Sequence, residues 1–399
     1  MRSTTAPLVG VRVLDFTRYE AGPTCTLLLA FLGAEVIKIE HPTKGAVHRR
    51  PFHPQGSKDD LYFVLLNLNK RSLCLDITSP CGRKLFEKLV KCSDVIVDNL
   101  DEKARKRLGL HYEELKKVNP NLIMASLSGY GSYGPLAGYP SMDMTAQAMG
   151  GIMSLTGERD SPPLRCGVSV ADSCAGTLLA LGVVAALYRR EVTGKGGEVE
   201  VSLQDAAVHL GRSLMGAYIA YGTQAVKCGN RLEDVVPWDV YPARDGYVAI
   251  CVISDSSFER LLEIIERKDL RLSNDIRERV RHREIIDQAI AEWTCNRTKY
   301  EILHTLGRQG VPCGAVLNSD EISGETHLWQ RRMLVEIEHP HWGKRVVIGS
   351  PVKFIGQGES IQASPLLGQD TRRLLSKLLE LQPSELERLE QEGTIKTLE

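Results

Sequence analysis

The sequence carries no net charge, because 50 lysine and arginine residues balance 50 aspartate and glutamate residues. This balance argues against a general binder of nucleic acid or of anionic membranes, so any anion site has to be local. The first residues, MRSTTAPLVGVRVLDF, lack the apolar segment of a signal peptide. The longest apolar run, Ala175 to Tyr188, is too short to span a bilayer and is typical of a buried helix. We therefore expect a cytoplasmic protein that binds neither nucleic acid nor a membrane.

The motifs of several other protein classes are also missing. The ten cysteines occur singly, without a CxxC pair or a cysteine and histidine group at zinc spacing, which predicts reduced structural thiols and no metal site. Neither a GxSxG motif nor the residue order of a hydrolase triad is present. The turn TRYEAGPTC lacks the GxGxxG pattern that binds NAD, although the strand after it ends in Glu40, where dinucleotide-binding folds keep an acid.

The first half of the chain alternates short apolar strands with amphipathic helices. The stretches VRVLDF, EVIKIE and DVIVDNL are typical of buried strands, and PTCTLLLAFLG and CGRKLFEKLVKCS are typical of the helices between them. Such alternation predicts βαβ units on a parallel sheet, and therefore an α/β, Rossmann-like fold.

The pattern changes after about Gly222. The stretch WDVYPARDGYVAICVI predicts a hairpin around Asp245-Gly246, charged helices follow, and GVPCGAVLN predicts a returning strand. A chain of 399 residues is also too long for one ordinary core. We therefore expect a large Rossmann-like domain over residues 1–222 plus 326–399, and a smaller α+β domain over residues 225–325.

The stretch RCGVSVADSCAGTLLALGVVAALYRR contains a single acid, Asp172, among residues that are mostly small or apolar and typical of a buried segment. Aspartate is a preferred helix N-cap, and a helix from about Ser173 to Arg190 fits, with two arginines in its last turn. The residues that follow Asp172 are small, however, and small residues let another molecule approach the backbone closely. From the residues alone, a capping role and a functional role both stay open.

Two other stretches have an ordinary and a functional interpretation. SGYGSYGPLAGYP leaves the carboxyl end of an expected strand, where open α/β sheets bind ligands, but it is equally compatible with a long surface loop. HRRPFH, from His48 to His53, is either an anion-binding patch or a solvated charge run.

Several longer stretches together resemble the class III, or family III, CoA-transferases. These stretches are VRVLDFTRYEAGPTCTLLLAFLGAEVIKIEHPTKGAVHRR, LNLNKRSLCLDITSPCGRKLFEKL, SLSGYGSYGP and GVSVADSCAGTLLALGVVAALYRREVTGKGGEVEVSLQDA. GVPCGAVLN and SPLLGQDT also match later segments of that family, so the resemblance covers nearly the whole chain. The group includes formyl-CoA, carnitine and benzylsuccinate CoA-transferases and is related to the 2-methylacyl-CoA racemases.

The resemblance implies that Asp172 is a catalytic nucleophile. A carboxylate at this position attacks an acyl-CoA thioester and forms an aspartyl-acyl anhydride, then an aspartyl-CoA thioester, from which CoA passes to an acceptor acid. Backbone amides at a helix start or in a glycine loop would stabilise the oxyanions. The reaction would use CoA thioesters as substrates and would need no metal and no other cofactor.

Further positions carry over one at a time from the resembling enzymes. Glu20 falls where formyl-CoA transferase has a glutamine near the nucleophile, and Asp143 matches an acidic position beside it, so both are candidate catalytic residues. Arg107 is expected to pair with a CoA phosphate. The positions that correspond to CoA contacts are Arg18, Tyr19, His41, Leu75, Asn99, Leu100, Arg107 and Leu108.

Two departures from the family pattern narrow the expected reaction. Met142 stands where the related racemases have a histidine, and a thioether cannot exchange a proton, so a racemase or isomerase is the alternative. The run of glycines that formyl-CoA transferases carry after the position of Gln204 is missing, which makes formate and oxalate poor substrate candidates. We therefore expect a larger acceptor acid with succinyl-CoA as the donor.

The resemblance also implies an assembly. The resembling enzymes form interlocked dimers of two ring-like chains, so we expect a homodimer. Some relatives pair two different subunits, which leaves a heteromer possible, with this chain as a non-catalytic CoA-binding subunit as a further alternative.

Overall fold

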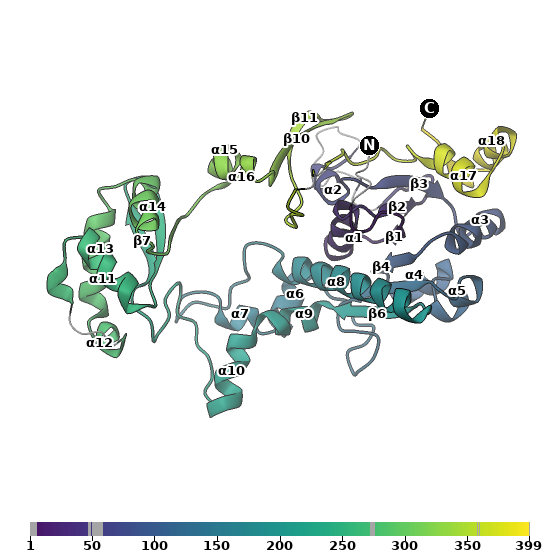
Figure 1. The fold of residues 1–399 in the computed structure, drawn as a ribbon. Helices are drawn as coiled ribbons and strands as arrows, with labels where there is room; N and C mark the ends of the chain where they lie inside the picture. The colour runs from purple at the N-terminus through teal and green to yellow at the C-terminus, as the bar shows by residue number, and fades with distance from the viewer. Residues whose placement is uncertain are drawn as a thin grey trace. The chain divides into compact units, whose positions relative to one another are not determined.

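The computed structural model describes residues 6–46, 49, 59–271, 276–356, 358 and 360–398. They form two compact units: unit 1 comprises Met1–Met153, Arg165–Gly222 and Thr326–Glu399, and unit 2 comprises Ser154–Leu164 and Thr223–Glu325 (Figure 1). The predicted large domain included residues 154–164, which the structure assigns to unit 2. Two contacts explain the difference, because the Gly157 carbonyl accepts from the Gly229 amide at 3.1 Å and Ser161 accepts from the Lys227 ammonium.

Unit 1 is built on a seven-stranded sheet in the order β12-β3-β2-β1-β4-β5-β6. The pairings are parallel except that β12 runs antiparallel to β3. The α/β, Rossmann-like fold predicted from the alternating pattern is therefore confirmed for this unit. The strands are β1 (Arg12–Phe16), β2 (Glu35–Glu40), β3 (Arg71–Leu75), β4 (Val95–Asp98), β5 (Ile123–Ser128), β6 (Gly197–Ser202) and β12 (Ile395–Lys396).

Helices cover both faces of this sheet, which is why its strands are apolar on both sides. Val13 and its neighbours on one face pack against α1 and α8, whereas Leu14 and its neighbours on the other pack against α3 and α17. The helices of this unit are α1 (Ala21–Phe31), α2 (Leu61–Leu66), α3 (Pro80–Lys91), α4 (Glu102–Leu108), α5 (Tyr112–Val118), α6 (Asp143–Met149), α8 (Val170–Thr193), α9 (Leu203–Leu210), α10 (Arg212–Tyr221), α16 (Thr326–Gln330), α17 (Thr371–Leu379) and α18 (Pro383–Gln391). A hairpin of β10 (Leu334–His339) and β11 (Gly343–Ile348) completes it, and α7 (Ile152–Leu155) leads toward unit 2.

Helix α8 is the longest helix of the described residues, and by length and composition alone it could cross a membrane. Its Ala175, Leu179 and Val183 are fully buried in the core beside β1, as expected of a helix that packs on a sheet.

Unit 2 has its own core and a three-stranded antiparallel sheet in the order β7-β8-β9. The hairpin expected around Asp245-Gly246 is confirmed, because β7 (Trp238–Ala243) pairs with β8 (Gly246–Cys251). The returning strand is β9 (Cys313–Ala315). The helices are α11 (Asp255–Ile264), the short 3-10 helix η2 (Lys268–Leu270), α12 (Ile276–Arg281), α13 (Arg283–Thr294), α14 (Lys299–Arg308) and α15 (Ser319–Gly324).

Candidate active site

The strand order of the large sheet indicates where a ligand binds. The chain runs outward from β1 through β2 to β3, then returns to add β4 on the other side of β1. In open α/β sheets ligands bind beyond the carboxyl ends of the strands at such a reversal. Here the turn Thr17–Glu20 follows β1, and Asn99 follows β4.

Asn99 fixes the backbone of that turn. Its side-chain oxygen accepts from the Arg18 amide at 2.8 Å, and its side-chain nitrogen donates to the Arg18 carbonyl at 2.6 Å. Tyr19 has a φ of 64°, in the left-handed region that non-glycine residues adopt only when their surroundings impose it. A Cβ atom on Gly22 would lie 2.6 Å from the Thr17 Cβ, so only glycine lets α1 start this close to the turn.

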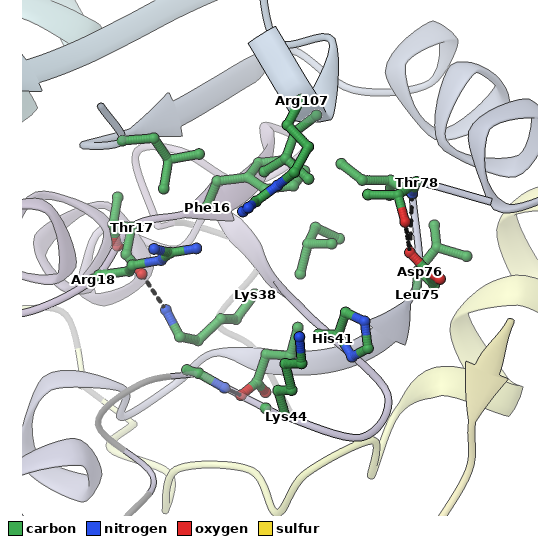
Figure 2. Close-up of a pocket in the computed structure, with 17 residues that line it drawn as sticks. Phe16, Thr17, Arg18, Lys38, His41, Lys44, Leu75, Asp76, Thr78 and Arg107 are labelled. Atoms are coloured by element: carbon green, nitrogen blue, oxygen red, sulfur yellow. Dashed lines mark hydrogen bonds between the residues drawn. The ribbon is translucent and has the colours of Figure 1, made fainter. Parts of the chain in front are cut away.

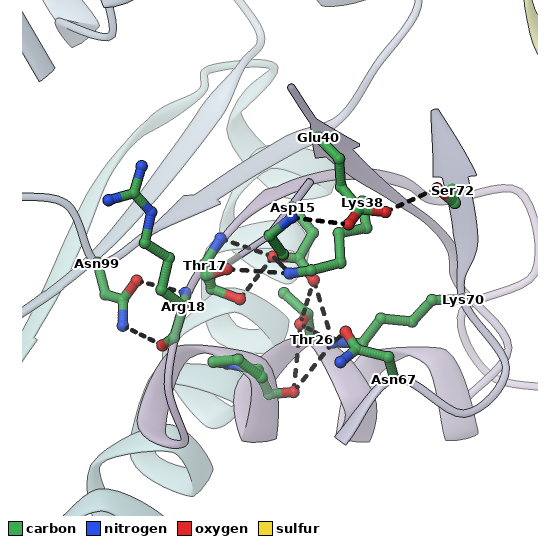
Figure 3. A network of polar contacts seen from close by, with 12 residues as sticks. Asp15, Thr17, Arg18, Thr26, Lys38, Glu40, Asn67, Lys70, Ser72 and Asn99 are labelled. Carbon is green, nitrogen blue, oxygen red and sulfur yellow. Dashed lines mark hydrogen bonds and ion pairs between the residues drawn. The ribbon is translucent and has the colours of Figure 1, made fainter. Parts of the chain in front are cut away.

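A buried ionic network at β1, β2 and the start of β3 holds the turn in place (Figure 3). Asp15 on β1 lies 3.1 Å from the Lys70 ammonium and 3.7 Å from the Lys38 ammonium, and all three side chains are buried. Lys38 also donates to the Thr17 carbonyl at 2.9 Å, and Lys70 donates to Thr26 at 2.7 Å. Burial acts to raise the pKa of Asp15, but Lys38 and Lys70 overcome it and hold that pKa well below its usual range. The turn therefore rests on a buried ionic network that we did not predict from the sequence.

A cavity of about 350 Å³ lies between this turn and the ends of β2 and β3. Four basic residues line it: Arg18 from the turn after β1, His41 and Lys44 from the segment after β2, and Arg107 from α4 (Figure 2). Of the predicted CoA contacts, the structure brings Arg18, His41, Leu75, Leu100, Arg107 and Leu108 to this cavity. The other two contribute to the turn, since Tyr19 lies beside Arg18 in a small adjoining pocket and Asn99 holds the Arg18 backbone.

The two acids that line the cavity are already bound to neighbours. Glu40 pairs with Arg49 at 2.7 Å and accepts from Ser72 at 2.7 Å. Asp76 accepts from the Thr78 hydroxyl at 2.6 Å; partial burial acts to raise the pKa of Asp76, but its bonds to Thr78 lower it overall. The remaining charged side chains of the cavity are basic, as an anionic ligand requires.

Arg49 belongs to the HRRPFH stretch that was considered as an anion patch. Its guanidinium is buried between Glu40 and Asp59, at 2.7 and 2.9 Å, so it serves the fold. The remaining residues of the stretch lie outside the described ones. The glycine-rich stretch is an exposed loop, with Tyr133 81% exposed, and it leads from β5 to Asp143.

Asp172 does not cap α8, so that prediction is wrong. The helix begins at Val170 with Ser169 at the N-cap, which places Asp172 in the third helical position. Asp143, the first residue of α6, supplies the acceptor instead, because its Oδ1 accepts from the Ala171 amide at 2.9 Å and from the Asp172 amide at 3.2 Å. Its Oδ2 accepts from Gln147 at 2.6 Å.

The same contacts remove the expected oxyanion donors at this helix start. The amides of Ala171 and Asp172 donate to Asp143, and the Ser173 amide donates to the Ser169 carbonyl at 3.0 Å. The first turn therefore acts on Asp172 through the partial positive charge of the helix end.

Glu20, at the start of α1, contacts the residue next to Asp172. One Glu20 oxygen accepts from the Tyr62 hydroxyl at 2.5 Å, and the other accepts from the Ser173 hydroxyl at 3.0 Å. The small residues after Asp172 explain this approach, since a Cβ on Gly176 would lie 2.3 Å from the Ala21 carbonyl oxygen. The missing side chain at Gly176 therefore admits α1. Tyr62 was not predicted, because nothing in its local sequence distinguishes it.

Three carboxylates, Asp172, Glu20 and Asp143, thus gather at the start of α8. Burial raises the pKa of Asp172 to about 7, and the negative charges of Glu20 and Asp143 add to the effect. The Asp172 carboxylate is therefore poorly stabilised when ionised, as a reactive nucleophile should be. Within the described ranges, no group of three histidine, cysteine or acidic side chains could hold a metal ion.

Comparison with known proteins gives consistent matches over most of the chain. The sequence model of CoA-transferase family III matches residues 8–371. Formyl-CoA:oxalate CoA-transferase of Rhodopseudomonas palustris (strain BisA53) is 34% identical, with 98% of both chains covered. The enzyme of that name from Streptomyces coelicolor is 35% identical, covering 98% of this chain and 100% of the relative. The crystal structure of a CAIB/BAIF family protein from Brucella suis superimposes with a TM-score of 0.82 at 30% identity, covering 94% of this chain and 99% of that one.

Proposed function

We propose that Asp172 carries CoA between two substrates, because this chain belongs to CoA-transferase family III. Membership of that family makes it a transferase that acts on an acyl-CoA and a carboxylic acid. The observation that carries this proposal is the position of Asp172. It stands at a helix start with its pKa raised to about 7, next to Glu20 on the turn whose Arg18 lines the basic cavity. The turn Thr17–Glu20 therefore borders the basic cavity through Arg18 and contacts the start of α8, beside Asp172, through Glu20.

The proposed reaction proceeds through three covalent intermediates on Asp172, namely two anhydrides and one thioester. An Asp172 oxygen attacks the donor thioester carbonyl, the C–S bond breaks, and CoA leaves as a thiolate. The thiolate attacks the aspartyl carbonyl, so the donor acid departs with an oxygen from Asp172 and leaves an aspartyl-CoA thioester. The acceptor carboxylate then displaces CoA to form the second anhydride. Attack of the thiolate on the acceptor carbonyl gives the product and returns Asp172 with an oxygen from the acceptor.

The cavity supplies binding for the phosphate-bearing part of CoA in this proposal. Arg18, Lys44 and Arg107 suit its phosphate groups. Glu40 does not serve a ribose here, because Arg49 and Ser72 occupy its oxygens.

Arg107→Ala is expected to raise the KM for acyl-CoA about 10- to 100-fold and to change kcat by less than about threefold, because a lost charge-assisted hydrogen bond is worth about 1.5–3 kcal/mol of binding. Steady-state kinetics with varied acyl-CoA measure both constants. Lys106→Ala, on the same exposed stretch of α4 but outside the cavity, is the matched control. A KM that changes equally in both variants would remove Arg107 from the CoA site.

We propose succinyl-CoA as the donor and a carboxylic acid larger than formate as the acceptor. The relatives named above make formyl-CoA and oxalate a second pair to examine. Incubation of each donor with a panel of carboxylic acids, read by mass spectrometry of the CoA products, tests the proposal. Appearance of a new acyl-CoA that depends on the added acid supports it. Loss of the thioester to free CoA with every acid would contradict it.

Two observations argue against the racemase alternative. Met142 is 56% exposed and has no exchangeable proton, and both Asp143 oxygens already accept hydrogen bonds. Solvent deuterium entering the α-position of an acyl-CoA, without an acceptor acid, would favour the racemase instead. Binding of acyl-CoA without turnover would favour a non-catalytic subunit.

We also propose the interlocked homodimer of ring-like chains that the family resemblance implies. An apolar stripe on α8 supports a second copy as its partner, because Leu181, Tyr188 and Val192 are 65%, 74% and 68% exposed. Monomers rarely leave such large side chains together in water. Light scattering is expected to give the mass of two chains, and the mass of one chain would contradict the dimer.

A further inference from the structure

Glu20 brings a negative charge to the reacting end of the proposed site. Among the residues that the structure describes, two hydroxyl groups donate to this carboxylate, from Tyr62 at 2.5 Å and from Ser173 at 3.0 Å. Hydroxyl groups carry no charge, so they fix the carboxylate in place without neutralising it. Asp143 differs, since its Oδ1 receives two amides from the positive end of α8.

The position of Glu20 is set by packing as well as by these hydrogen bonds. It precedes the first residue of α1, and α1 lies against α8 at Gly176, where a side chain would meet the Ala21 carbonyl. Ser173 is the direct neighbour of Asp172 along α8. A substrate carbon bonded to an Asp172 oxygen therefore lies close to the Glu20 carboxylate.

We propose that Glu20 sets the charge preference of the acceptor subsite, disfavouring an acid that carries a second carboxylate close to the reacting one. The inference rests on the proposed transfer through Asp172. It assigns the acceptor to monocarboxylic acids, or to acids whose second carboxylate lies several bonds away. Repulsion between like charges falls with distance and with solvent screening, so a short diacid such as oxalate suffers most and succinate least.

Matched acid pairs separate this charge effect from shape. Oxalate and oxamate, malonate and its monoamide, and succinate and its monoamide have nearly the same size and differ by one negative charge. The ratio of kcat/KM for the diacid to that for its monoamide reports the penalty for the second charge. Succinate is supplied as the ¹³C-labelled acid, because its transfer from succinyl-CoA would otherwise regenerate the same compounds. Any effect of Glu20 on the reactivity of Asp172 is common to both members of a pair and cancels in the ratio.

The variant to compare with the wild type is Glu20→Gln, which keeps the size of the side chain and one acceptor oxygen. We expect the oxalate-to-oxamate ratio to rise about tenfold or more, as removal of one nearby charge predicts, and the succinate ratio to rise less. The control is Glu114→Gln, which makes the same substitution at an exposed glutamate on α5. We expect it to leave all three ratios unchanged.

The outcomes are distinct. The inference is supported if Glu20→Gln raises the diacid-to-monoamide ratio most for oxalate, less for malonate and least for succinate. Equal changes for diacids and monoamides, or no change, overturn it. If Glu20→Gln does not fold, the wild-type ratios are measured at low and high salt, because screening should narrow the oxalate penalty; a salt-independent ratio overturns the inference. Absence of transfer to any acid by the wild type, with succinyl-CoA and formyl-CoA as donors, refutes the proposed function itself.

Discussion

Asp172→Asn is expected to lower kcat/KM for CoA transfer about 10³-fold or more while the protein stays folded. An amide oxygen is a far weaker nucleophile than a carboxylate, and without the aspartyl intermediates neither half-reaction proceeds. Asp205→Asn is the matched control, since Asp205 also lies in the first turn of a helix, α9, and is exposed. Full activity in Asp172→Asn, with deamidation to aspartate excluded by mass spectrometry, would contradict a nucleophilic role.

The same variant should be more stable than the wild type at alkaline pH. The folded protein raises the pKa of Asp172 from 3.8 to about 7, so it binds this proton more tightly than the unfolded chain does. Stability is therefore lost as the pH rises from about 4 to about 7 and stays lower above that range. Asparagine does not ionise, so we expect a gain of about 2 kcal/mol at about pH 8 and little gain at about pH 4, after allowing for the partial exposure of Asp172. Urea unfolding at both pH values measures the difference, and a destabilised variant at pH 8 would contradict the account.

Lys70→Met is expected to cost about 3–5 kcal/mol of folding free energy, because it removes one partner from a buried ion pair. Lys70 is fully buried and donates to Asp15 at 3.1 Å, Thr26 at 2.7 Å and Asn67 at 3.0 Å. Methionine fills a similar volume but leaves Asp15 with Lys38 as its remaining cationic contact, 3.7 Å away. Asp15 then holds a charge that the interior compensates poorly.

Urea unfolding compares this variant with Lys84→Met, an exposed position on α3 where a change below about 0.5 kcal/mol is expected. Loss of the network should also loosen the Thr17–Glu20 turn, so activity should fall even under conditions where the variant is folded. A Lys70→Met variant as stable as Lys84→Met would show that the buried network does not stabilise the fold, and full activity in the folded variant would show that it does not hold the turn.

The sheet was predictable because its signals are local. Apolar strands such as VRVLDF and EVIKIE alternate with helices whose caps and periodicity lie within each segment. The same strands contain Asp15 and Lys38, and charged residues inside strands buried on both faces are a signal for an internal ion pair. Their partner Lys70 could not be inferred, since the pairing depends on how β3 lies beside β2.

The candidate site was predictable only in part. The local sequence singled out Asp172, but its role as a nucleophile and most of the cavity positions came from the family resemblance. The capping prediction failed because the acceptor for the amides of α8 is Asp143, an acid 28 positions before Ala171, rather than a residue of the helix itself. Tyr62 reaches Glu20 only after α2 folds against α1, so neither local propensity nor periodicity marks it.

The covalent role of Asp172 is tested most directly by following oxygen. The protein is incubated with unlabelled succinyl-CoA and an acceptor acid, chosen from the panel, that carries ¹⁸O in both carboxylate positions. After digestion, the peptide containing Asp172 is weighed by mass spectrometry, with Asp172→Asn as the control. The account predicts that the wild-type peptide gains ¹⁸O at Asp172, because the second anhydride returns this side chain with an oxygen from the acceptor. Appearance of ¹⁸O in the released donor acid while the Asp172 peptide stays unlabelled would contradict it, since the two acids would then have exchanged oxygen without the enzyme carboxylate.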